Sequence, residues 1–305
     1  MGEKMFEFIS FNEDKLGQIL DLCNKHMKFD TLSETLLREK VIDDPDFNEQ
    51  LIFTLYSENE LVGFLDGVIR QIGEERIGYI KLMVVAKEWR RKGAGKKMYL
   101  ALEEKFREQK VDKIRVYDVP FNYYMPGIDP RYTPALSFFE TMGFKRFGDT
   151  ANLTVDLQGQ DFTTEREEKA LLEKGVEIGR AGYDDMREIM GFVDEHFALW
   201  RHEVANAYNS LPVSLHIARL DGRVKAFSGH NGNNFGTGWF GPMGTHPDLR
   251  GLGIGGILLK RCLQDMKEWG LEKSIIPWVG PIRFYSYYVN AVVDRVFWRY
   301  EKILK

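Results

Sequence analysis

The sequence contains few of the residues that form disulfides or zinc sites. Only 2 of its 305 residues are cysteines, Cys23 and Cys262. Two distant thiols make no disulfide framework, and no Cys/His cluster has zinc spacing, so we predict no metal site. Isolated thiols are typical of buried side chains in a reducing compartment. We therefore expect a cytoplasmic protein.

Long hydrophobic runs and an excess of positive charge are missing as well. No stretch approaches the roughly 18 to 20 apolar residues that cross a bilayer. The opening residues 1–5 lead into no apolar segment of a secretory signal. The formal net charge is −4, without the basic surface that nucleic acids need. We expect neither membrane nor nucleic-acid partners, and the oligomeric state is not indicated.

Strand and helix patterns alternate along the chain, twice in the same order. The first half predicts strands up to residues 79–85, a glycine turn, an amphipathic helix to about residue 109 and a strand pair across 144–157. The second half predicts strands up to 239–245, a glycine turn and a helix over 254–269. This order predicts an α/β protein with mixed (α+β) sheets, in two domains at 1–157 and 175–305 with a polar linker at 158–174.

The glycine turn of the second half has the composition of an anion-binding site. It reads Arg250-Gly251-Leu252-Gly253-Ile254-Gly255-Gly256, between a predicted strand and a predicted helix. A helix N-terminus offers unpaired N–H groups and a positive dipole end, and glycines let the backbone approach phosphates. Dinucleotide-binding folds share the Gly-x-Gly-x-x-Gly spacing, but there it follows an early strand and precedes an acidic residue. A plain packing turn is the other alternative.

The turn and its setting resemble the acyl-CoA motif of the GNAT acetyltransferases, Arg-x-x-Gly-x-Gly between a strand and a helix. The second half matches from Thr245 to Gly255, and the first from Val85 to Gly95, where Lys87 replaces the usual proline. The family's order of elements can be laid over both halves, and the tandem arrangement resembles that of mycothiol synthase. The resemblance implies two GNAT domains and an N-acetyltransferase that uses acetyl-CoA.

The resemblance also implies one cradle for the cofactor in each half. The strand residues Met243, Gly244 and Thr245 would bind the pantetheine arm, and the N–H of Met243 or Gly244 would polarise the thioester. The phosphates would lie on Arg250, Gly251, Leu252, Gly253, Ile254, Gly255 and Gly256. The corresponding cradle of the first half is Arg90, Arg91, Lys92, Gly93, Ala94 and Gly95.

The two halves differ at one position of their last helix, where the family carries a residue that takes part in the reaction. In the family a tyrosine of this helix commonly protonates the departing CoA thiolate. Phe139 occupies that position in the first half, whereas Tyr285 occupies it in the second, with Tyr287 and Tyr288 as alternatives of register. A phenol can donate this proton and a phenyl ring cannot. We therefore expect catalysis by Tyr285 in the second domain, while the first binds CoA without reacting or completes the acceptor cleft.

The acceptor and the general base are less well indicated. The strand at 238–244 holds no carboxylate, so no base is named. The aromatic, proline-rich loop 119–132 is expected to lie over the acceptor site of the second domain, with Tyr123, Tyr124 or Arg131 as substrate contacts. A hydrophobic inter-domain plug is the equal alternative. The sequence thus favours acetyl transfer to the primary amine of a small molecule. A regulatory or scaffolding acyl-CoA-binding protein with little turnover and a protein N-acetyltransferase are the alternatives.

Overall fold

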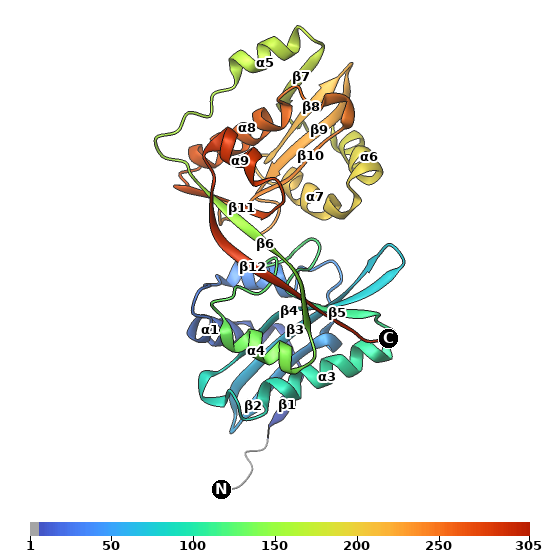
Figure 1. Ribbon diagram of the computed structural model, residues 1–305, viewed down its shortest axis with the longest axis vertical. Helices are drawn as coiled ribbons and strands as arrows, with labels where there is room; N and C mark the ends of the chain where they lie inside the picture. The colour runs from blue at the N-terminus through green and yellow to red at the C-terminus, as the bar shows by residue number, and fades with distance from the viewer. Residues whose placement is uncertain (1–5) are drawn as a thin grey trace. The chain divides into compact units, whose positions relative to one another are not determined.

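The computed structural model describes residues 6–305, so residues 1–5, on which the secretory-signal prediction depends, lie outside it. Two compact units make up the chain (Figure 1). Unit 1 contains the chain up to Asp149 together with Phe297–Lys305, and unit 2 is Thr150–Val296. No helix in the described part of the chain is long and apolar enough to cross a bilayer.

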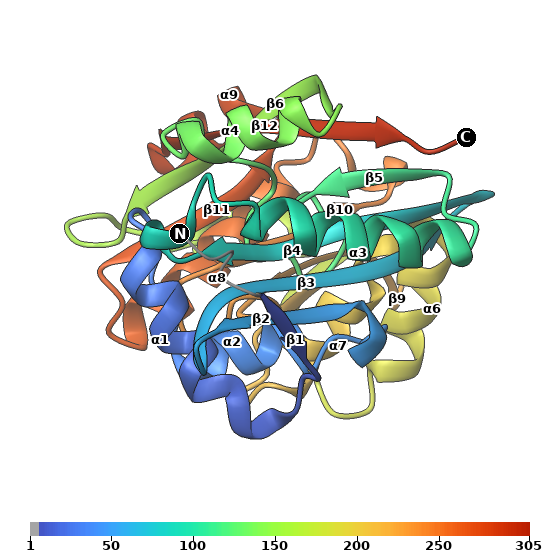
Figure 2. The same cartoon turned by 90° about the horizontal axis from the view of Figure 1, so that it is seen from below.

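Unit 1 is built around a twisted, mostly antiparallel sheet. Its strands are β1 (Glu7–Ile9), β2 (Ile52–Ser57), β3 (Glu60–Ile72), β4 (Glu75–Val85) and β5 (Lys113–Val116), and its helices are α1 (Leu16–His26), α2 (Glu34–Val41), α3 (Ala94–Glu108) and α4 (Thr133–Thr141). Neighbouring strands pair in antiparallel register from β1 to β4, while β4 and β5 are parallel. Figure 2 shows α3 lying along β3 and β4. Glycines permit this close approach, since a Cβ on Gly78 would lie 2.8 Å from the Phe106 ring of α3.

Unit 2 repeats this plan with a second sheet, in the order β10-β9-β8-β7. Its elements are α5 (Glu165–Leu172), β7 (Val176–Arg180), α6 (Met186–His196), α7 (Arg201–Asn209), β8 (Leu215–Leu220), β9 (Arg223–His230), β10 (Phe240–Thr245), α8 (Ile254–Glu268), β11 (Lys273–Val279) and α9 (Ile282–Val289). The apolar face of α8, with Leu258 and Cys262 fully buried, packs on the sheet. The two glycine turns therefore precede equivalent helices, α3 and α8.

The strand pair predicted across 144–157 is wrong. These residues form one long strand, β6 (Lys145–Asp156), which begins in unit 1 and ends in unit 2. Its second half pairs with β11, from Asp156 opposite Lys273 to Ala151 opposite Val279. The missing partner in unit 1 comes from the end of the chain, β12 (Val292–Ile303), which lies between β5 and β6.

The C-terminal strand is tied firmly into unit 1. Phe297 and Tyr300 are buried in its core, and the Tyr300 hydroxyl donates to Glu140 at 2.7 Å. Arg299 donates to Asp118 at 2.9 Å, and Lys302 donates to Glu103 at 2.7 Å. The units therefore do not follow the expected boundaries at 157 and 175. Residues 297–305 belong with unit 1 and residues 158–174 with unit 2, because each unit completes its sheet with a strand from the other half of the sequence.

A buried ionic cluster lies beside the middle of β4. Lys81 of β4 is 1% exposed, and its ammonium donates to Asp44, which also receives two hydrogen bonds from Arg70 at 2.8 and 2.7 Å. Burial lowers the pKa of Lys81, although Asp44 opposes this effect. Asp66 of β3 is also buried, and its Oδ2 accepts no hydrogen bond from a described residue. Burial raises the pKa of Asp66 to about 8, so its carboxyl holds a proton at neutral pH.

The protonated Asp66 predicts a pH dependence of stability. An unfolded Asp releases its proton near pH 4, whereas the folded state keeps it up to about pH 8. Because the folded state binds more protons in this window, the free energy of unfolding should fall as pH rises through it, by at most about 1.4 kcal/mol per pH unit. Urea unfolding at pH 5 and pH 8 measures the slope. Asp66→Asn should reduce the slope but not abolish it, because burial also raises the pKa of Asp118 to about 7. An equal slope in that variant would contradict the assignment.

Candidate functional site

In unit 1, β4 bends away from β5 at a β-bulge. The β3–β4 register shifts between Asp66 and Gly67, which leaves Lys81 as the extra residue on β4. The parallel pairing with β5 ends where Ile80 meets Val116, although β4 continues to Val85. Bulges re-aim a strand and end its pairing. The outer edge of β4 beyond Ile80 is therefore open.

Two residues of β4 direct backbone polar groups toward this open edge. The Ala86 N–H donates to the Val62 carbonyl on β3. Because successive N–H groups along an antiparallel strand point to opposite sides, the N–H groups of Met83 and Val85 point away from β3. Side chains confirm the direction, since the Tyr117 hydroxyl donates to the Met83 carbonyl at 3.3 Å and Arg90 Nε donates to the Val85 carbonyl at 3.0 Å. An extended ligand arm can pair with the N–H groups here.

The turn after β4 forms a concave nest of backbone groups. Arg91 has a φ of +59° and Gly93 a φ of +90°, both left-handed, and α3 begins at Ala94. The first N–H groups of a helix lack intrahelical acceptors, and alternating left-handed residues turn such groups inward. Ala94 is buried, while Lys92 and Lys96 are exposed around the turn. The arrangement can bind a phosphate-like anion.

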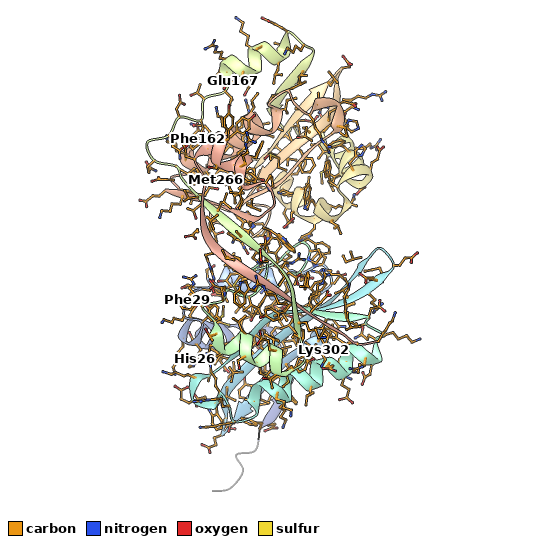
Figure 3. The ribbon with its side chains drawn as sticks, in the orientation of Figure 1. His26, Phe29, Phe162, Glu167, Met266 and Lys302 are labelled. Atoms are coloured by element: carbon orange, nitrogen blue, oxygen red, sulfur yellow. The ribbon has the colours of Figure 1, made fainter. Side chains whose placement is uncertain are left out.

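A cavity of about 460 Å³ joins the open edge of β4, this turn and α4. His26 at the end of α1, labelled in Figure 3, forms part of its wall. Its main lining residues are His26, Met27, Met83, Val85, Arg90, Gly93, Gly95, Lys96, Tyr117, Met125, Ile128, Asp129, Tyr132, Ala135, Phe138, Phe139 and Met142. The sequence predicted substrate contacts in loop 119–132, but not the loop residues Met125, Ile128, Asp129 and Tyr132 that line this cavity. The lining residues from α1 were not predicted either, because nothing in their local sequence marks them.

The tyrosines of this cavity already donate their hydroxyl protons to protein acceptors. Tyr117 donates to Met83, as described, and Tyr132 donates to Asp30 at 2.7 Å. Burial is the first cause that raises the pKa of both phenols. Phe139, which also lines the cavity, is 1% exposed and has no proton to donate.

Unit 2 has the same bulge and the same open edge. The β9–β10 register shifts between Phe240 and Met243, and an isolated parallel bridge joins Trp239, the residue before β10, to Ile275 of β11. The chain then continues along β10 to Thr245 without further pairing to β11 among the described residues. The bulge thus places both open edges at equivalent points of the two units.

Backbone alternation decides between the two N–H groups that the sequence suggested. The His246 N–H donates to Lys225 of β9, so Gly244, two residues earlier, also faces β9. Met243 and Thr245 therefore direct their N–H groups to the open edge. Of the two candidates for polarising a carbonyl, only Met243 has the required direction.

The second turn reproduces the nest of the first with glycines. Gly251 has a φ of +79° and Gly253 a φ of +77°, and α8 begins at Ile254. The predicted site residues divide by exposure: Arg250, Gly251 and Leu252 are exposed, whereas Ile254 and Gly256 are buried. Tyr288 packs against this turn, since a Cβ on Gly256 would lie 2.1 Å from its Cε1. In unit 1 the residue at the Gly256 position is the exposed Lys96.

Contacts with the glycine helices establish the register of α4 and α9. A Cβ on Gly95 would lie 3.4 Å from the Phe138 ring, and a Cβ on Gly255 would lie 3.3 Å from the Phe284 ring. Phe138 and Phe284 are therefore equivalent. Phe139 and Tyr285, each the next residue, are equivalent as well.

Tyr285 has the surroundings of a protonated phenol. Its ring contacts Phe284 and Phe240, with centroid separations of 5.1 and 6.1 Å. Burial raises the pKa of Tyr285 to about 12. Its side chain is half-buried and packs against the apolar core of unit 2. Tyr287, a register alternative, is instead 79% exposed.

The other titratable residues near the second turn have structural partners. His246 accepts a hydrogen bond from the Asp248 N–H at 3.2 Å, which caps the short helical turn after β10. Its ring packs on His196, with centroids 5.0 Å apart. Glu203 is buried in α7. Among the described residues, no group of three or more His, Cys, Asp or Glu side chains could hold a metal ion.

The loop residues predicted to contact substrate lie in unit 1. Tyr124 is buried in the core, and its hydroxyl donates to the Thr31 carbonyl at 3.4 Å. Arg131 forms an ion pair with Asp129 at 2.6 Å and lies over the Phe29 ring, 4.4 Å from its centroid. Phe29, labelled in Figure 3, follows α1. Asp129 and Tyr132 bring this loop to the wall of the cavity, while the assignment of Tyr124 and Arg131 to an acceptor stays a prediction.

The burial of Tyr124 predicts a large effect on stability. Tyr124→Ala should lower the free energy of unfolding by about 3 kcal/mol, because a buried aromatic ring is lost. Tyr124→Phe keeps the ring and removes one hydrogen bond, so it should cost about 1 kcal/mol. Urea unfolding of both variants checks this order. A Tyr124→Ala variant of unchanged stability with a raised KM for the acceptor would assign the residue to substrate binding instead.

Comparisons with known proteins agree with this geometry. A model of the acetyltransferase (GNAT) family matches residues 19–144 and again residues 181–286. A solved structure described as the GCN5-related glucosamine N-acetyltransferase region of a fungal multi-domain GH3 beta-N-acetylglucosaminidase aligns with a TM-score of 0.83 and 20% identity over 99% of this chain. The chain spans only 38% of the length of that protein.

Two further structures match over nearly the full length of both chains. A GCN5-related N-acetyltransferase from Sphaerobacter thermophilus has a TM-score of 0.73 at 17% identity, covering 98% of this chain and 96% of its own. A tandem GNAT protein from the clavulanic acid biosynthesis pathway has a TM-score of 0.68 at 15% identity, covering 98% of each. Identities this low show the fold alone, and no curated protein matches the chain. Because the family model covers most of both halves, the chain belongs to the GNAT acetyltransferase family, whose members use acetyl-CoA as acyl donor, and it carries two GNAT domains in tandem.

Proposed function

We propose that the protein transfers an acetyl group from acetyl-CoA to the primary amine of a small molecule, and that the transfer takes place in unit 2. The observation that carries this proposal is the pair Phe139 and Tyr285, which stand at equivalent positions beside equivalent glycine turns. Only Tyr285 has a proton to donate, and its side chain is half-buried against the apolar core of unit 2. A pKa raised to about 12 keeps that proton available at neutral pH.

The donor would bind along the open edge and turn of unit 2. The N–H groups of Arg250, Gly251, Leu252, Gly253, Ile254, Gly255 and Gly256 would receive the phosphates, as a helix N-terminus favours. Met243 and Thr245 would pair with the pantetheine amides as an added strand. Gly244 would contribute by packing, because its N–H faces β9.

Met243 and Tyr285 would have different roles in the acetyl transfer. The Met243 N–H would stabilise the negative charge that develops on the thioester oxygen when the neutral amine attacks the carbonyl carbon. Tyr285 would donate its proton to the sulfur as the carbon–sulfur bond breaks, and the attacking nitrogen loses its own proton to solvent. Orientation of the two reactants supplies the rest of the rate enhancement.

Unit 1 would bind acetyl-CoA without transferring its acetyl group. The cavity of about 460 Å³ provides the volume, and Arg90, Arg91, Lys92, Gly93, Ala94 and Gly95 provide the anion cradle. Phe139 stands where a proton donor is needed, and the hydroxyls of Tyr117 and Tyr132 already have acceptors. This cavity also favours the second candidate function, an acyl-CoA-binding regulatory or scaffolding protein.

We place the protein in the cytoplasm, since Cys23 and Cys262 are both buried free thiols.

Release of free CoA thiol tests the function. Purified protein and acetyl-CoA are incubated with a panel of amino sugars, polyamines, amino acids and short peptides, and the thiol is measured with a chromogenic disulfide. We expect thiol release that depends on a small amine. Release with peptides alone would indicate a protein N-acetyltransferase. Tight acetyl-CoA binding without release for any amine would overturn the proposal in favour of the binding protein.

A further inference from the structure

A second cavity in unit 2 lies apart from the glycine turn. Its volume is about 310 Å³, and it is lined by His230, Asn231, Gly236, Gly238, Trp239, Met266, Trp269 and Leu271. Met266, labelled in Figure 3, belongs to the last turn of α8. The glycine turn precedes the first residue of this helix, and a helix of 15 residues is about 22 Å long. The cavity and the proposed phosphate cradle are therefore at opposite ends of α8.

A buried carboxylate, Asp265, lies behind the lining residue His230. Asp265 of α8 receives two hydrogen bonds from Arg180, both at 2.7 Å, and one from Nε2 of His216 at 2.8 Å. Burial opposes ionisation of Asp265, but these donors outweigh it and hold its pKa below the usual range. Nδ1 of His216 accepts from Arg261 at 3.1 Å, so both nitrogens of that ring have partners. Asp265 is thus an ionised acceptor with a neighbouring cation.

In His230, unlike in His216, one ring nitrogen has no hydrogen-bond partner among the described residues. Nε2 of His230 lies 3.2 Å from Asp265 and can donate to the carboxylate, and in the tautomer that carries its proton on Nε2 the Nδ1 atom is an acceptor. His230 is 1% exposed, and its Nδ1 has no hydrogen-bond partner in the described part of the chain. A buried polar atom without a partner costs about 1–3 kcal/mol. Because His230 lines the cavity, a ligand there can supply the missing donor.

The other residues that line the cavity indicate which kind of ligand fits it. Trp269 packs against His230 with ring centroids 4.8 Å apart, and Met266 and Leu271 add apolar surface. Trp269 is 40% exposed, so the wall that it forms reaches the protein surface. No Asp, Glu, Lys or Arg is among the lining residues, so the wall offers no counter-ion to a charged ligand. The volume fits a small ring rather than a polymer.

We propose that this cavity binds a small neutral ring compound that donates a hydroxyl or N–H hydrogen bond to Nδ1 of His230 and packs against Trp269. The site is separate from the proposed acetyl-CoA cradle, so the binding stands whether or not unit 2 transfers acetyl groups.

Phenol and anisole form a matched pair of probes, because they share a ring and only phenol has a hydroxyl donor. Titration of the full-length protein, followed through the tryptophan indole N–H signals by NMR, gives both dissociation constants. We expect phenol to bind about tenfold more tightly than anisole, with perturbation centred on Trp269. In His230→Phe, which keeps the ring volume and leaves Asp265 its other donors, the two probes should bind equally.

A second variant guards against a folding defect in the first. Trp269→Ala changes an exposed position and leaves the buried network intact, so it should weaken both probes about fivefold while phenol stays preferred. Saturating acetyl-CoA should displace neither probe. Equal affinity of the two probes in the wild type, or a phenol preference that survives in folded His230→Phe, would overturn the proposal. Binding of neither probe would assign Nδ1 to an ordered water and overturn it as well.

Discussion

Tyr285→Phe is expected to lower kcat by about 10²–10⁴-fold, because general-acid catalysis typically contributes this much. The KM for acetyl-CoA should stay within about twofold, since the change removes one oxygen atom and leaves the glycine turn intact. With the pKa raised to about 12, Tyr285 should remain protonated from pH 7 to 10, so its ionisation should cause no loss of activity in that range. Steady-state kinetics of thiol release measure both parameters.

Tyr287→Phe is the matched control for this prediction. It makes the same chemical change on the same helix at a residue that is 79% exposed, and it should leave kcat unchanged. A fully active Tyr285→Phe variant would contradict the proposed role. Loss of activity in Tyr288→Phe instead would move the proton donor to the residue that packs against Gly256.

Substitution of one glycine in each turn should remove one acetyl-CoA site at a time. A Cβ on Gly93 meets no atom within 4 Å, and a Cβ on Gly253 meets only the Tyr288 hydroxyl, at 3.8 Å. Tryptophan at either position can therefore extend into the anion cradle. Calorimetry should give about two sites for the wild type and about one for each of Gly93→Trp and Gly253→Trp. A wild type with one site, lost in Gly253→Trp, would leave unit 1 as an acceptor scaffold.

The backbone cost of these substitutions needs its own control. Both glycines have left-handed φ angles, +90° and +77°, which cost a residue with a side chain about 1–2 kcal/mol. Gly222 has a φ of +75° and open space around it, in the turn between β8 and β9. Gly222→Trp should carry the same strain and keep both sites. Loss of a site in this variant would show that strain, and not blocking of the cradle, explains the result.

The sequence predicts the local parts of the site well. Glycines at 251 and 253 before an apolar helix indicate a strand–turn–helix unit from neighbouring residues alone, and the helix begins at Ile254 as expected. The equivalence of Phe139 and Tyr285 also follows from local spacing, and the contacts of Gly95 and Gly255 confirm this register. The roles proposed for these residues remain predictions.

Local sequence does not predict that each unit completes its sheet with a strand from the other half of the chain. Gly148-Asp149 is as compatible with a hairpin turn as with the extended chain that β6 forms through it. The choice depends on residues 297–303, which lie far along the chain and contribute Phe297 and Tyr300 to the core of unit 1. The part of the cavity wall that α1 contributes also depends on tertiary packing. His26 lies near the first glycine turn only when α1 packs on the sheet.

The claim that transfer takes place in unit 2 is tested most directly by single-turnover acetyl transfer in the two turn variants, with an amine that the wild type accepts. Gly93→Trp should transfer acetyl groups at a rate within about threefold of the wild type, because it blocks the cradle beside Phe139. Gly253→Trp should show no transfer above the uncatalysed rate, because it blocks the cradle beside Tyr285. The reverse pattern, with Gly93→Trp inactive and Gly253→Trp active, would place the chemistry in unit 1 and contradict the account.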